Sequence, residues 1–211
     1  MAADERLQQL RRACDHGVLE AQGRLLRERM RAGELTEEQV RLAAYCGDPL
    51  GNALLGPRAP NVPLDVEERL EGLADWGRSA CVRAGVGIAR SGLPSFERDQ
   101  NDPGPVRELI EACEQWLCAP SVFAAMEAAR TGAELGKRWL MTRYSLAWVP
   151  AAAASAASST LHEPGFPYLW FAGDDPPSAD IWQSVVDELV PWALGLSDPV
   201  AGRMADGTVD R

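Results

Sequence analysis

The chain has 211 residues, of which 46% are hydrophobic and 25% charged, and its mean hydropathy is −0.21. This length predicts one or two domains with a buried core, and no run of about 18 apolar residues is present to span a membrane. The 31 acidic and 21 basic residues give a net charge of −10, which argues against a protein that binds the phosphate backbone of nucleic acids.

Helical periodicity dominates residues 1–56, which we interpret as an N-terminal helical unit. The apolar spacing predicts a helix over residues 4–15, and a second helix from Val18 to Met30. Thr36-Glu-Glu-Gln39 has the pattern of a capping box, and it predicts a helix that ends at Gly47. Asp48 and Pro49 then favour the start of a short helical turn.

A break follows at residues 56–63, GPRAPNVP, because three prolines disfavour regular structure. We place a boundary here, and residues 63–195 are expected to form the main helical domain. Asp65 is a helix cap, and the pattern after it predicts a long helical stretch to about Arg90. The glycines of this stretch either allow another helix to come close or split it in two near Gly77.

The region after the long stretch is expected to hold a loop and two further helices. The loop is placed at residues 92–102. The next helix carries the clearest apolar stripe of the chain, at Val106, Leu109, Ile110, Cys113 and Leu117. Residues 121–149 form another helix, with a stripe beginning at Val122, Met126 and Ala129 that we expect to be buried.

The C-terminal third changes character after an alanine-rich helix predicted near residues 151–160. Residues 162–177, HEPGFPYLWFAGDDPP, read as an irregular segment. A last helix is expected over residues 178–195, and residues 196–211 are expected to be a flexible tail. No strand pattern occurs, so the predicted class is all-α, as a multi-helix bundle or a short helical-repeat-like array.

Cysteine usage favours a reducing compartment. The five cysteines are an odd number placed mostly at core-like positions, unlike a secreted disulfide framework. The first residues, MAADERLQQLRR, also lack the apolar segment of a secretory signal. We therefore expect a cytoplasmic location.

The sequence contains no convincing catalytic or metal-binding pattern. Cys14-Asp15-His16 holds three catalytic residue types, but residues two apart on a helix point away from each other. His162 is an isolated loop histidine. Residues 131–138 resemble a phosphate loop without its first glycine and its closing serine or threonine. We expect no enzymatic activity, no cofactor and no metal.

The segment most typical of a protein-binding surface combines aromatic and acidic residues. It supplies our candidate partner-binding residues, Tyr168, Trp170, Phe171, Asp174 and Asp175. Aromatic anchors carry much of the energy of protein interfaces. The alternative is that these aromatic side chains fold back over the core. Residues 150–211 hold nine acids and two bases, so a partner protein is expected to be basic.

Residues 73–117, LADWGRSACVRAGVGIARSGLPSFERDQNDPGPVRELIEACEQWL, resemble the helical signature of immunity proteins found in bacterial polymorphic-toxin loci. The pattern is a tryptophan helix followed by a cysteine, an LPxFE segment, a turn with Asp102, and a helix ending in a tryptophan. The matching residues are Trp76, Cys81, Leu93, Pro94, Phe96, Glu97, Asp102, Pro105, Arg107, Ile110, Glu111, Ala112 and Trp116. The alanine-rich helices expected after residue 122 fit the pattern too, so the resemblance extends over about residues 73–150. It implies a helical interaction protein, and it carries over no catalytic residue. Within this segment we expect Trp76 and Trp116 to be core residues, and Glu97, Asp102 and Arg107 to supply a buried or loop-fixing ion pair and a helix cap.

Three functional hypotheses follow. The first is a non-enzymatic immunity or inhibitor-type protein that binds a partner protein such as a toxin. The second is a helical-repeat adaptor or scaffold in bacterial signalling. The third is an enzyme whose site is assembled from dispersed residues such as Cys14, His16 and His162.

Overall fold

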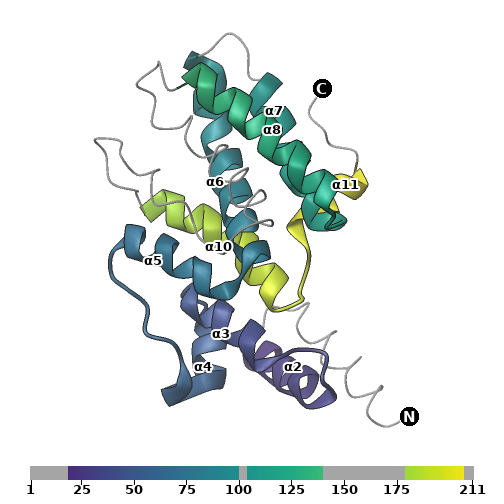
Figure 1. Ribbon diagram of the computed structural model, residues 1–211. Coiled ribbons are helices and arrows are strands. Elements are labelled where there is room, and N and C mark those ends of the chain that lie inside the picture. The colour runs from purple at the N-terminus through teal and green to yellow at the C-terminus, as the bar shows by residue number, and fades with distance from the viewer. Residues whose placement is uncertain (1–18, 100–103, 140–178, 207–211) are drawn as a thin grey trace. The chain divides into compact units, whose positions relative to one another are not determined.

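The computed structural model describes residues 19–99, 104–139 and 179–206 (Figure 1). Every regular element in these ranges is a helix, which confirms the predicted all-α class. None of the described helices is long and apolar enough to cross a membrane. The helices predicted at residues 4–15 and 151–160 and the irregular segment 162–177 lie outside the described residues.

Two compact units divide the chain. The first unit comprises Met1–Val62 and Val190–Ser197, and the second comprises Pro63–Leu189 and Asp198–Arg211. Compactness does not show that a unit folds on its own. The domain division at residues 56, 63 and 195 therefore stays a prediction.

The first unit contains α2 (Leu19–Ala32), α3 (Glu37–Tyr45), α4 (Pro49–Leu55) and the 3₁₀ helix η1 (Gly56–Arg58). The capping box that starts α3 is confirmed: the Thr36 hydroxyl accepts the Gln39 amide at 3.2 Å, and the Thr36 amide donates to the Gln39 side chain at 2.8 Å. The Asp48 carboxylate caps α4 by accepting the Gly51 amide at 2.6 Å.

Close packing of α4 holds the core of the first unit. A Cβ atom at Gly51 would lie 2.9 Å from the backbone nitrogen of Ala44, so only glycine allows this approach.

The Arg29 side chain of α2 donates hydrogen bonds to the carbonyl oxygens of Leu194 at 2.7 Å and Gly195 at 3.2 Å. The buried hydrophobic residues among the described part of this unit are Leu25, Leu26, Leu35, Val40, Leu42, Ala43, Ala44, Tyr45, Cys46, Leu55, Ala193 and Leu194.

The second unit begins with α5 (Val66–Gly72), the 3₁₀ helix η2 (Leu73–Trp76) and α6 (Arg78–Asp99). Gly77 separates η2 from α6 with a φ of 83°, a conformation that favours glycine. Of the two arrangements expected for this stretch, the split near Gly77 is therefore the one observed.

The loop expected at residues 92–102 is wrong for its first part, since α6 continues to Asp99. Pro94 lies inside this helix. The fixed φ of proline is close to the helical value, but inside a helix proline removes one hydrogen bond and its ring crowds the carbonyl four residues earlier. Neither Gly92 nor Pro94 ends α6.

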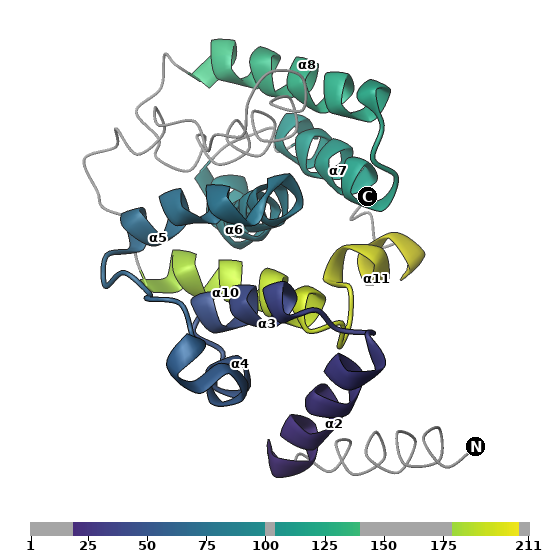
Figure 2. The ribbon, with the colours of Figure 1, turned by 60° about the horizontal axis from the view of Figure 1, so that its bottom comes forward.

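Helix α7 (Gly104–Cys118) lies beside α8 (Val122–Trp139), as Figures 1 and 2 show. The face expected to be buried on α8 is wrong, because Val122 and Met126 are exposed. Ala125, Ala128 and Thr131 are buried instead. Small side chains let two helix backbones come close, so α8 packs through its alanines and leaves larger residues outside.

The last described helices are α10 (Ala179–Ala193) and α11 (Pro199–Asp206). The helix expected at residues 178–195 is confirmed by α10, with Pro191 inside it. The flexible tail expected at residues 196–211 is wrong for α11, whose Val200 is buried. The Asp198 carboxylate starts α11 by accepting the amides of Val200 and Ala201 at 3.1 and 3.2 Å.

Candidate functional site

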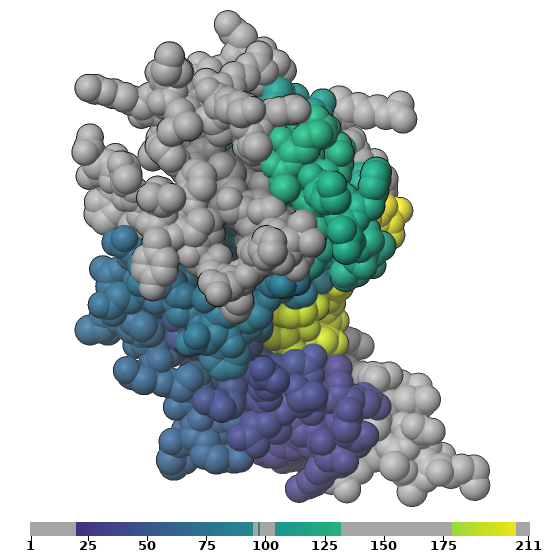
Figure 3. All heavy atoms as spheres, in the orientation of Figure 1, coloured from purple at the N-terminus to yellow at the C-terminus, as the bar shows by residue number. Residues whose placement is uncertain are grey.

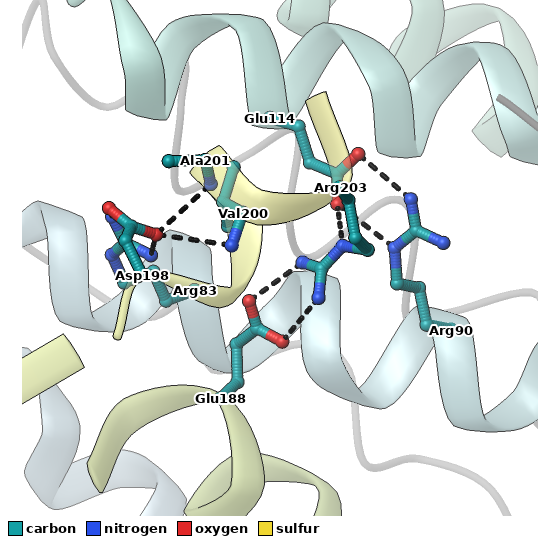
Figure 4. A network of polar contacts seen from close by, with 8 residues as sticks. All are labelled: Arg83, Arg90, Glu114, Glu188, Asp198, Val200, Ala201 and Arg203. Carbon is teal, nitrogen blue, oxygen red and sulfur yellow. Dashed lines mark hydrogen bonds and ion pairs between the residues drawn. The ribbon is translucent and has the colours of Figure 1, made fainter. Parts of the chain in front are cut away.

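A network of buried and partly buried charged side chains joins helices of the second unit (Figure 4). It draws on α6, α7, α10, α11 and the residue that caps α11. We define the charged network as Arg83, Arg90, Glu114, Glu188, Asp198 and Arg203. Three guanidinium groups thus balance three carboxylates.

Glu114 of α7 lies at the centre of the network and is only 2% exposed. Arg90 of α6 binds both of its carboxylate oxygens at 2.9 Å. Nε of Arg203 from α11 reaches the same carboxylate at 2.8 Å. One buried carboxylate therefore joins three helices that are far apart in the sequence.

Glu188 of α10 holds the other side of Arg203. The two terminal nitrogens of Arg203 donate to the two oxygens of Glu188 at 3.1 and 2.7 Å, a two-pronged contact that matches the planar guanidinium group. Burial alone lowers the pKa of Arg203, but the hydrogen bonds and charges of Glu188 and Glu114 outweigh it and raise the pKa above its usual value. Arg203 is thus held as a cation.

The second contact of α11 is the pair of Arg83 and Asp198. Both terminal nitrogens of Arg83 bind Asp198, each at 2.8 Å. Desolvation raises the pKa of Asp198, yet the hydrogen bonds from Arg83 and from the amides of α11 lower it below its usual value overall. The aspartate is therefore both the cap of α11 and the partner of an arginine on α6.

These contacts decide what the network can do chemically. Both oxygens of Glu114 and of Glu188 accept hydrogen bonds from guanidinium groups. A carboxylate engaged in this way is poorly placed to take a proton from a substrate. These contacts instead join α11 to α6, α7 and α10.

The described cysteines are Cys46, Cys81, Cys113 and Cys118, and only the last is exposed. Burial raises the pKa of each of the other three to about 12, helped by the charge of Asp48 at Cys46 and of Glu114 at Cys113. Partial burial, followed by the charge of Asp198, also raises the pKa of Cys118. No described cysteine is thereby activated as a nucleophile.

Alkylation of the native protein at pH 8 is expected to modify Cys118 well before Cys46, Cys81 or Cys113. A rise of three pKa units lowers the thiolate fraction about a thousandfold, and burial also blocks the reagent. Peptide mapping after a timed iodoacetamide pulse scores each cysteine separately. In urea, which unfolds the protein, these four cysteines should react at similar rates. If Cys113 of the native protein is labelled as fast as Cys118, Cys113 is not buried.

A second feature is an exposed apolar surface on the first turns of α8. Val122 is 61% exposed, Phe123 79% and Met126 58%. Their spacing of three and four residues puts them on one side of the helix, and we call these three residues the α8 apolar face. Figure 3 shows α8, in green, at the surface of the molecule.

One ion pair in the region of the family resemblance was expected. Nη2 of Arg107 contacts the Glu97 carboxylate at 2.6 Å, with both side chains about one-third exposed. The pair connects the end of α6 to the first turns of α7. Trp116 is buried, as expected of a core residue, whereas Trp76 is only partly buried. Asp102, the expected cap, lies outside the described residues.

The structure does not describe the other expected site residues. Tyr168, Trp170, Phe171, Asp174 and Asp175 are outside the described residues, as are Cys14, His16 and His162. The sequence reasoning missed Glu114, Glu188 and Arg203. A signal existed for Glu188, an acid between the buried Val185 and Leu189, and for Arg203, an isolated base in an acidic region.

Within the described ranges, no group of three histidine, cysteine or acidic side chains is arranged to hold a metal ion. Comparison of the chain with protein-family models, with curated proteins and with solved structures gave no match. The resemblance to immunity proteins therefore stays a prediction from the residues quoted above.

Proposed function

We propose that this chain is a non-enzymatic protein that binds another protein, as an immunity or inhibitor-type protein binds a toxin. The observation that carries the proposal is the α8 apolar face. An exposed phenylalanine flanked by valine and methionine is typical of the centre of a protein interface, which is enriched in aromatic residues and methionine. A single exposed apolar residue is common on protein surfaces, but three on one side of a helix are less so.

The charge of the chain supports a basic partner. The net charge is −10, and nine of the acids lie in residues 150–211 with only two bases. Complementary charge speeds association and selects among partners more than it adds affinity. A basic toxin such as a nuclease would fit this charge, and the family resemblance points in the same direction.

The test is capture of a partner from the native host, followed by affinity measurements on the purified pair. Phe123→Asp introduces a charge at the centre of the α8 apolar face. We expect it to weaken binding at least tenfold, since truncation of a central aromatic residue commonly costs about 2 kcal/mol or more. Leu64→Asp is the matched control, because Leu64 is also apolar, 94% exposed and in the same unit.

A variant with Tyr168, Trp170 and Phe171 replaced by alanine tests the segment that the sequence favoured. Deletion of residues 162–211 would be unsuitable, since it removes α10 and α11 with their buried residues. Loss of binding in this triple variant alone would keep a protein-binding function and reject the α8 apolar face. If the wild-type chain captures no stoichiometric partner, the proposed function fails. A partner from a signalling complex would favour the adaptor hypothesis over the inhibitor.

A further inference from the structure

The attachment of α11 to the second unit is more polar than apolar. Val200 is the one apolar residue of α11 that is fully buried among those described, while Met204 is 39% exposed. Two polar contacts complete the attachment, at Asp198 and at Arg203. Figure 2 shows α11 as a short helix beside the end of α7.

The surroundings of Arg203 have the geometry of a ligand site. Its guanidinium group lies between two carboxylates that are 2% and 5% exposed, one on α7 and one on α10. Without Arg203, Glu114 keeps Arg90, whereas Glu188 loses the two-pronged contact to both of its oxygens. A buried carboxylate without a partner is strongly unfavourable, so this position requires a cation.

The required cation is a guanidinium group rather than an ammonium group. Three nitrogens of one planar fork bind Glu114 and Glu188 at 2.7–3.1 Å. A lysine ammonium is a point charge and cannot reproduce this fork. The Arg203 side chain is 24% exposed, whereas those of Glu114 and Glu188 are 2% and 7% exposed, so an incoming guanidinium group reaches these carboxylates only as Arg203 leaves them.

We propose that Glu114 and Glu188 form a guanidinium-binding site and that α11 is a displaceable strap whose Arg203 is the built-in ligand. An arginine side chain of a bound peptide takes the place of Arg203 and releases α11. The proposal does not depend on the α8 apolar face, because the two rest on different residues and different contacts.

The test uses the full chain with Arg203→Ala and ethylguanidinium, which replaces the deleted end of the side chain. The ligand is expected to bind with a dissociation constant on the order of 1–10 mM, as suits a molecule of so few atoms. At ten times this constant, the equilibrium constant for folding should rise about elevenfold. Ethylammonium and sodium chloride at equal concentration should have no such effect.

Two variants make the result specific. Arg130→Ala removes an arginine that is 56% exposed and pairs with Glu127 on the same helix, and ethylguanidinium should leave its stability unchanged. The double variant Arg203→Ala/Glu188→Gln lacks the carboxylate, and the rescue should disappear. Equal stabilisation of Arg203→Ala and the double variant would overturn the guanidinium site.

The wild-type chain supplies a measurement that needs no variant. Hydrogen exchange of the α11 amides should become faster in ethylguanidinium at concentrations that leave the exchange of α7 unchanged. Equal concentrations of ethylammonium should not accelerate it. If the exchange of α11 does not respond, or if α7 and α11 accelerate together, α11 is a fixed part of the unit and the strap is refuted.

Discussion

Replacement of Glu114 by alanine is expected to lower the free energy of unfolding of the second unit by about 3–5 kcal/mol. The carboxylate is 2% exposed and binds both Arg90 and Arg203. Its removal leaves two partly buried guanidinium groups, of which Arg90 loses both hydrogen bonds that it makes to Glu114. The loss of stability therefore includes the cost of keeping two guanidinium groups partly buried without this carboxylate, as well as the cost of the cavity.

Urea denaturation followed by far-ultraviolet circular dichroism measures this effect. Glu108→Ala is the matched control, because Glu108 lies on the same helix and is exposed. Its replacement should change the free energy of unfolding by no more than about 0.5 kcal/mol. A loss below about 1 kcal/mol for Glu114→Ala would mean that water already screens the charged network.

Local features of the fold could be predicted because neighbouring residues determine them. The capping box at Thr36 and Gln39, the cap at Asp48 and the stop at Gly77 each depend on a few consecutive residues. The ion pair of Glu97 and Arg107 joins residues only ten apart. Such features are visible in a single sequence.

The charged network could not be predicted because its partners are far apart in the sequence. Arg203 meets Glu114 across 89 positions, and Arg83 meets Asp198 across 115. A glutamate on an amphipathic helix normally marks the solvent face, and only tertiary packing makes Glu114 internal. The same limit explains the missed α11, since most of its residues are polar or small and its one buried apolar residue gives no stripe.

The buried face of α8 shows a different limit. Val122, Met126 and Ala129 form one periodic stripe, while Ala125 and Ala128 belong to another about one residue further round the helix. Hydrophobicity favours the first stripe, and close packing against α7 uses the second. Periodicity gives the helix correctly but cannot decide between two apolar sides when one is bulky and the other small.

Replacement of Gly87 by alanine is expected to destabilise the second unit by on the order of 2 kcal/mol, the range of overpacked interiors. A Cβ atom there would lie 2.6 Å from the backbone oxygen of Ser184 and 3.2 Å from Cβ of Glu188. The first neighbour is backbone and cannot rotate away, so α6 and α10 must separate. The shift would also pull Glu188 from Arg203.

Gly202→Ala is the matched control within α11, since a Cβ atom at this position meets nothing within 4 Å. Alanine favours a helix over glycine by up to about 1 kcal/mol, so this variant should be neutral or more stable. Alanine has the same helical preference at position 87. The variant is therefore destabilised only if the cost of the contact with Ser184 exceeds this gain. Opposite signs for the two variants in urea denaturation would therefore measure the close approach of α6 and α10 itself. Equal signs would mean that α6 and α10 move apart readily at Gly87.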